Sequence, residues 1–179
     1  MNDPFAKLVA PTQLEITREL PASCERVWEY LTDPELRKQW FCAGETGAGR
    51  GEPFVMDFDH TRISDTPPPS DIDCGDPVVI RGTIVTYEPP HKLVYRWPGT
   101  NEDDESLVTI ELTPHGAGTR LHLTHSRLVN PEFLKGASAG WHAHLDLLVD
   151  LTNGRDARDF WVHFEELKAT YEERIAAPS

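Results

Sequence analysis

Residues 105–126 contain two runs of alternating apolar and polar residues that meet at a short glycine-containing segment, residues 115–118. Such alternation is typical of a strand with one buried face, and a glycine-rich connection between two such runs is typical of a hairpin. The positions on the shared face are apolar with one exception: Val108, Ile110, Leu112, Leu121, Leu123 and His125. We therefore predict an antiparallel hairpin that places His125 among core-facing leucines.

Four further segments have the character of strands. Residues 13–20 and 54–58 alternate, residues 78–87 are rich in β-branched side chains, and residues 93–97 alternate after a proline-containing turn. With the hairpin they make about six strands, which we expect to pair antiparallel. Residues 60–77 are rich in proline and aspartate without a usable period, so we expect a long surface loop there and a candidate cavity rim.

Two short helices are expected directly after the first strand. Ser23 suits the N-cap position, and apolar residues recur at helical spacing over residues 24–31. Asp33 and Pro34 suit the cap and the first position of a second helix, which we expect to end near Trp40.

Two amphipathic helices are expected near the C-terminus, separated by Asn153 and Gly154. In the first, over residues 139–152, the apolar side holds Trp141, Leu145, Leu148 and Thr152. We assign the opposite side to solvent, with His142 and Asp146 paired four residues apart. The second helix carries an apolar stripe of Phe160, Phe164, Leu167, Tyr171 and Ile175.

This last stripe must be buried somewhere, because an isolated amphipathic helix is not stable in water. It can pack on the body of the same chain or on a second copy. We hypothesise a homodimer through Phe160, Phe164, Leu167 and Tyr171, with packing inside the chain as the alternative.

Composition excludes several classes of partner. The chain has 179 residues and a formal net charge of −13, so nucleic acid and anionic membrane surfaces would repel it. No apolar run approaches the roughly 20 residues of a membrane span, and residues 1–13 lack the features of a secretion signal. Cys24, Cys42 and Cys74 suggest neither a disulfide framework nor a paired-cysteine metal site. We expect a cytoplasmic protein of one domain, residues 1–179.

Several motifs together carry a resemblance to a known family. They are residues 27–34 with 39–41, residues 82–84 with 88–90 and 93–97, residues 108–113 with 118–121 and 124–125, and residues 140–141 with Leu145 and Leu148. Together with the order of the elements, they resemble the activator of heat shock protein ATPase-like branch of the START and birch-pollen-allergen-like superfamily. The resemblance covers about residues 14–151.

The resemblance implies an α+β helix-grip fold, in which a curved antiparallel sheet wraps around a long C-terminal helix. The core would span about residues 14–152, with an extra helix over about residues 156–176 that departs from the family pattern. A cavity between sheet and helix can hold an apolar small molecule in this family. Our candidates for its lining are Phe54, Met56, Phe58, Tyr95, Trp97, His125, Trp141, His144, Leu145 and Leu148.

His125 and His144 are the candidates for acid–base chemistry, since histidine titrates near neutral pH. A histidine among leucines is more often a hydrogen-bonded core residue, and we prefer that interpretation. His142 and His144 lie two residues apart on a helix and point to different faces, so they should not share a metal ion. We expect neither a metal nor a cofactor.

The leading hypothesis is therefore that the chain binds an apolar small molecule and has no defined catalytic activity. A chaperone-ATPase-activator-like interaction module is the first alternative, suggested by the family. An enzyme of the cyclase, aromatase or hydrolase type, using His125 or His144 in the same cavity, is the second.

Overall fold

The structure is a computed structural model that describes residues 4–72, 77–99 and 104–176. Its strands are β1 (Lys7–Ala10), β2 (Gln13–Leu20), β3 (Pro53–Phe58), β4 (Val78–Glu88), β5 (Lys92–Trp97), β6 (Ser106–His115) and β7 (Gly118–Ser126). Its helices are α1 (Cys24–Thr32), α2 (Pro34–Arg37), the 3-10 turn η1 (His60–Arg62), α3 (Pro131–Thr152) and α4 (Phe160–Ala176).

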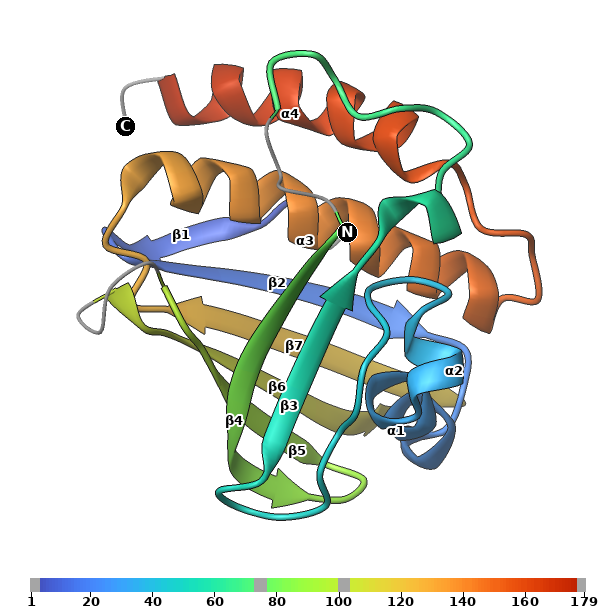
Figure 1. The fold of residues 1–179 in the computed structure, drawn as a ribbon. Helices are drawn as coiled ribbons and strands as arrows, with labels where there is room; N and C mark the ends of the chain where they lie inside the picture. Colours follow the sequence, from blue (N-terminus) through green and yellow to red (C-terminus); the bar gives the residue numbers. More distant parts are fainter. Residues whose placement is uncertain (1–3, 73–76, 100–103, 177–179) are drawn as a thin grey trace.

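All strands belong to one antiparallel sheet, in the order β1-β2-β7-β6-β5-β4-β3. The sheet curves around α3, and α4 lies on the side of α3 that faces away from the sheet (Figure 1). The α+β helix-grip fold implied by the resemblance is thus confirmed. None of the described helices combines the length and the hydropathy that crossing a bilayer requires.

The hairpin predicted from the alternating residues is formed by β6 and β7. Its register pairs Val108 with His125 and Ile110 with Leu123, and these side chains are buried. At the turn, Gly116 has a φ of 59°, a left-handed conformation that glycine adopts readily. The two strands lie in the interior of the sheet order, so the hairpin supplies the middle of the concave face.

One strand was not predicted. All four residues of β1 are exposed, so its sequence carries no alternation between buried and exposed positions. It pairs with β2 at one edge of the sheet, where Lys7 lies opposite Glu15. A strand this short, without a buried face, leaves no periodic signal in the sequence.

The two short helices follow the predicted capping. The Ser23 side chain accepts a hydrogen bond from the backbone N–H of Arg26, and Asp33 caps α2 by accepting from Glu35 and Leu36. At the end of α2, the Arg37 side chain is 1% exposed. Its guanidinium donates to four backbone carbonyls, those of Cys42, Ala43, Gly44 and Val55. This side chain therefore holds the connection between α2 and β3 in place.

The side of α3 that we assigned to solvent is covered by α4, so that assignment is wrong. His142 and Asp150 are buried there. The α4 residues Phe160, Phe164, Leu167 and Tyr171 are also buried within the chain, while the Ile175 side chain lies outside the described part. Of the two packing alternatives, the structure shows packing on the same chain, and these four residues are not available for a dimer contact.

The segment 60–77 is not entirely a surface loop, because its first residue, His60, is buried in η1. Farther along, Ser64 and the backbone N–H groups of Asp65 and Thr66 donate to the carboxylate of Asp159, just before α4. Burial raises the pKa of Asp159, but hydrogen bonds to its carboxylate outweigh this effect and lower the pKa to about 2. The loop is thereby attached to the start of α4. Residues 73–76, including Cys74, lie outside the described residues.

Candidate functional site

A cavity of about 440 Å³ lies beside the N-terminal half of α3. The sheet contributes Phe58, Val78, Ile80, Trp97 and His125 to its lining. The 3-10 turn η1 contributes His60, and connecting segments contribute Phe41 and Ile72. The helices contribute Glu132, Phe133, Gly136, Ala137, Gly140, Trp141, His144, Phe160, Trp161 and Phe164. Aromatic rings thus form most of the wall, and Glu132 is the only formally charged residue in the part of the wall that the structure describes.

Five of the candidate pocket residues line this cavity: Phe58, Trp97, His125, Trp141 and His144. The other five, Phe54, Met56, Tyr95, Leu145 and Leu148, are buried elsewhere in the core. Phe54 stacks on Tyr95 with 4.0 Å between the ring centroids, and both line a void of only about 10 Å³. Alternation along a strand predicts which side chains point toward the helix, but it does not predict which of these side chains border a cavity.

Much of the wall comes from residues that we did not name. Phe41 stacks on Trp141 with the ring centroids 4.9 Å apart, and Phe133 stands at the N-terminal end of α3. Phe160 and Trp161 close another side, because the hydrogen bonds of Asp159 hold the start of α4 against the loop. The aromatic character of Phe41 and Trp161 was visible in the sequence, but no periodic pattern connected them to the sheet.

His125 is a fully hydrogen-bonded core residue. The indole N–H of Trp141 donates to Nδ1 of His125 at 3.0 Å. Because Nδ1 accepts, the proton of the neutral ring is on Nε2, which donates to Oγ of Ser106 at 2.9 Å. Burial lowers the pKa of His125 to about 3. Both ring nitrogens are used and the ring is neutral, so His125 has no free position for acid–base chemistry.

Among the residues that the structure describes, His144 has a hydrogen-bond partner at one ring nitrogen only. Its Nδ1 donates to the backbone carbonyl of Trp40 at 2.7 Å. Burial lowers the pKa of His144 to about 3, and the neighbouring His60 adds to this effect. The ring lies in an aromatic setting, with centroids 5.1 Å from Phe41 and 4.4 Å from Phe160. His144 therefore lies in the cavity wall as a neutral ring.

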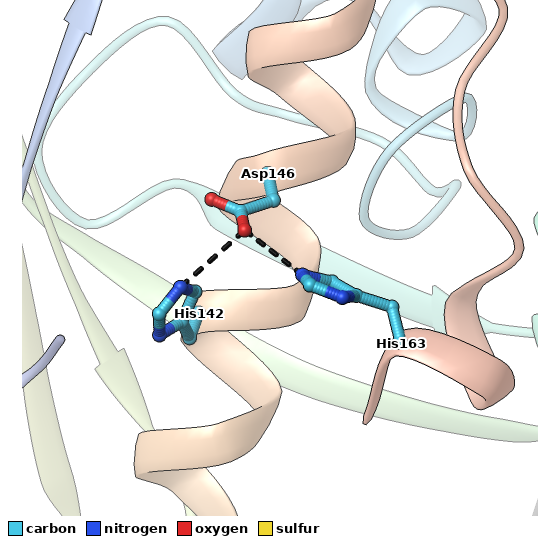
Figure 2. A group of neighbouring side chains, drawn as sticks. All are labelled: His142, Asp146 and His163. Atoms are coloured by element: carbon cyan, nitrogen blue, oxygen red, sulfur yellow. Dashed lines mark hydrogen bonds and ion pairs between the residues drawn. The ribbon is translucent and has the colours of Figure 1, made fainter. Parts of the chain in front are cut away.

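A second group of polar side chains joins α3 to α4 away from this cavity. Figure 2 shows His142 and His163 directed at one carboxylate oxygen of Asp146, Oδ2, with Nε2 atoms at 3.3 and 2.9 Å. The Tyr171 hydroxyl accepts from the backbone N–H of Ala6 and bonds Nδ1 of His142 at 3.1 Å. This group connects the N-terminal segment, α3 and α4.

The spacing within this group would accept a metal ion, because one ligand atom from each of His142, Asp146 and His163 lies within 4.8 Å of the others. The surrounding charges oppose it. Arg18 donates to Oδ1 of Asp146 at 2.9 Å, and Arg158 lies 3.5 Å from Oδ2. A divalent cation would stand beside two guanidinium groups that already compensate the carboxylate. We therefore assign this group a structural role.

The sequence profile of one family, described as activator of Hsp90 ATPase homolog 1-like protein, matches residues 21–153. The chain belongs to this family. The part that matches the Hsp90 ATPase activator-like profile runs from just before α1 to the end of α3. It ends before α4, so Phe160, Trp161 and Phe164 are additions to the cavity wall from outside the matched region.

Several solved structures share the fold of this chain. The protein encoded by gene BPP1335 from Bordetella parapertussis is 30% identical, with a TM-score of 0.75 over 96% of this chain and 91% of that one. CalU16 from Micromonospora echinospora is 20% identical, with a TM-score of 0.67 over 97% and 96%. Aha1 from Colwellia psychrerythraea, solved as a dimer, is 17% identical, with a TM-score of 0.62 over 78% and 95%. A search of the curated proteins finds no match.

Proposed function

We propose that this protein binds an apolar small molecule in the cavity between the sheet, α3 and the start of α4. The observation that carries the proposal is the cavity itself, about 440 Å³ in volume and lined mainly by aromatic side chains. Cavities of roughly 300–1,000 Å³ with such walls are the usual form of small-molecule sites. A ligand there would gain about 2.5 kcal/mol for every 100 Å² of apolar surface that it buries.

The chemistry of the wall favours binding over turnover. Neither a serine nor a cysteine is among the described residues that line the cavity. Cys42 is buried outside it, and burial raises the pKa of its thiol to about 12. His125 is hydrogen-bonded at both nitrogens, which removes it as an acid or base. These observations support a binding protein over the enzyme alternative.

Native mass spectrometry of gently purified protein, compared with the denatured sample, tests the proposal directly. We expect a released small molecule or, for an empty protein, saturable binding of an apolar probe such as naphthalene. Trp97, Trp141 and Trp161 line the cavity, so their fluorescence should change as the probe binds. Absence of both a bound mass and any saturable binding would refute the proposal.

A further inference from the structure

The orientation of His144 defines what its free nitrogen can accept. A backbone carbonyl can only accept hydrogen bonds, so the 2.7 Å contact with Trp40 places the proton of the ring on Nδ1. In a neutral imidazole, Nε2 then carries a lone pair and acts as a hydrogen-bond acceptor. The tautomer is set by the backbone of a residue outside the cavity wall.

This acceptor is open to the cavity. Nε2 of His144 forms no hydrogen bond with any residue that the structure describes, although His144 lines the wall. Three polar side-chain atoms are both fully enclosed and without a partner among the described residues: Nη2 of Arg18, the Tyr95 hydroxyl and Nε of Arg120. Nε2 of His144 also lacks such a partner, but it is not fully enclosed. It is therefore accessible from the cavity.

Besides His144, the polar side chains of the described wall are His60, His125, Glu132 and the tryptophans Trp97, Trp141 and Trp161, whose indole N–H groups can only donate. The two nitrogens of His125 are occupied by Trp141 and Ser106. Glu132 bonds Lys135 at 3.0 Å and is exposed at the start of α3. Neither lysine nor arginine is among the described lining residues, so an anionic group would find no counter-charge there.

We propose that the cavity selects a neutral aromatic molecule that carries one hydroxyl or N–H group, which donates a hydrogen bond to Nε2 of His144. The inference rests on the proposed binding function and adds the class of ligand. The aromatic rings around His144, including Phe41 and Phe160, suit a flat apolar body that makes stacked or edge contacts. A donor on that body compensates the acceptor that an apolar ligand would leave unpaired.

Four probes with one ring system test the inference: naphthalene, 2-methoxynaphthalene, 2-naphthol and 2-naphthoate. We expect 2-naphthol to bind about 10-fold more tightly than naphthalene and 2-methoxynaphthalene. This difference corresponds to one hydrogen bond that pairs an acceptor which the other two probes leave unpaired. The anionic 2-naphthoate should bind most weakly. Dissociation constants from tryptophan fluorescence or calorimetry decide the order.

The variant His144→Phe keeps a ring in the wall and removes the acceptor. We expect the preference for 2-naphthol over naphthalene, measured as the ratio of their dissociation constants in the same variant, to fall to within about twofold. His122→Phe is the matched control, because it makes the same substitution at a histidine that bonds Thr17 and does not line the cavity. It should keep the full preference.

Nuclear magnetic resonance provides a test that needs no variant. Long-range ¹H–¹⁵N spectra should show the His144 proton on Nδ1, and addition of 2-naphthol should shift the Nε2 resonance. A proton on Nε2, or equal binding of all three neutral probes, would overturn the inference and leave the proposed function standing. Tight binding of 2-naphthoate would overturn the inference that the cavity selects neutral molecules. Failure of every probe to bind would count against the proposed function itself.

Discussion

Oδ2 of Asp146 on α3 lies 2.9 Å from Nε2 of His163 on α4, and this contact connects the two C-terminal helices (Figure 2). The other carboxylate oxygen accepts from Arg18 on β2 at 2.9 Å. One carboxylate thus links the sheet, the long helix and the helix that lies outside the family match. Because the start of α4 also forms part of the cavity wall, this link helps to hold that part of the wall in position.

Asp146→Asn should destabilise the fold by about 3 kcal/mol, since it leaves the buried Arg18 guanidinium without its counter-charge. Urea unfolding followed by circular dichroism measures the loss. Asp156→Asn is the control, because Asp156 is exposed, and it should change stability by less than about 0.5 kcal/mol. Equal stability of the two variants would show that the carboxylate does not hold the helices together.

Acid should destabilise the protein from about pH 6.5 downward. Burial lowers the pKa of His125 and of His144 to about 3, and burial also lowers the pKa of His142. The unfolded chain therefore binds more protons than the folded chain below about pH 6.5, and stability falls as pH falls, by up to about 1.4 kcal/mol per pH unit for each histidine.

Urea titrations at a series of pH values between 8 and 5 measure this slope. His125→Gln should reduce the slope of the free energy of unfolding against pH by the contribution of that one histidine. A free energy of unfolding that stays constant over this range would mean that these rings are protonated in the folded state.

A further loss of stability should follow below about pH 4. Burial raises the pKa of Asp146, but hydrogen bonds from His142 and His163 and the charge of Arg18 outweigh this effect and hold the pKa well below its usual range. The stabilisation by this carboxylate is therefore present above the unfolded pKa and is lost as pH falls below it. The stability difference between wild type and Asp146→Asn should shrink in this range, and a constant difference would contradict the assignment.

Gly140→Leu should fill the cavity without disturbing α3. A Cβ atom at Gly140 would meet nothing within 4 Å, and the residue lines the cavity. We expect at least a 10-fold loss of naphthalene affinity with an unchanged or raised Tm, because glycine in a helix interior costs about 1 kcal/mol relative to alanine. Gly140→Ala, which adds one methyl group, should retain most of the affinity. Unchanged binding by the leucine variant would place the ligand elsewhere.

Arg37→Lys should cost about 3 kcal/mol of stability. The planar guanidinium bonds four carbonyls at once, which an ammonium group cannot do from the same position, so buried acceptors lose their donors. Chemical denaturation measures the effect, with Arg50→Lys in an exposed position as the control. If both variants unfold at the same urea concentration, the connection between α2 and β3 does not depend on this side chain.

Zinc should not stabilise the protein. The carboxylate of Asp146 is already compensated by Arg18 and Arg158, so the group with His142 and His163 has little net attraction for a cation. We expect the same Tm in the presence of zinc and of a chelator. A rise in Tm with zinc that is abolished in His163→Ala would instead identify this group as a metal site.

Local signals in the sequence predicted most of the helices and strands, and the helix-grip fold followed from the family resemblance. Alternation predicted the β6–β7 hairpin, and Ser23 and Asp33 marked the starts of α1 and α2, because capping and periodicity depend only on residues close in the chain. The exposed strand β1 left no such signal. The order of the elements and the motifs together indicated the family.

The candidate site depended on tertiary structure. Alternation placed His125 on an inward face, and the resemblance made His144 a candidate for the cavity. Only the packed fold showed that Trp141 and Ser106 occupy both nitrogens of His125, while Trp40 occupies a single nitrogen of His144. The same limit explains why His142 was assigned to solvent. Amphipathicity identifies the face of a helix that must be buried, whereas the element that covers the other face, here α4, is chosen by contacts between residues far apart in the chain.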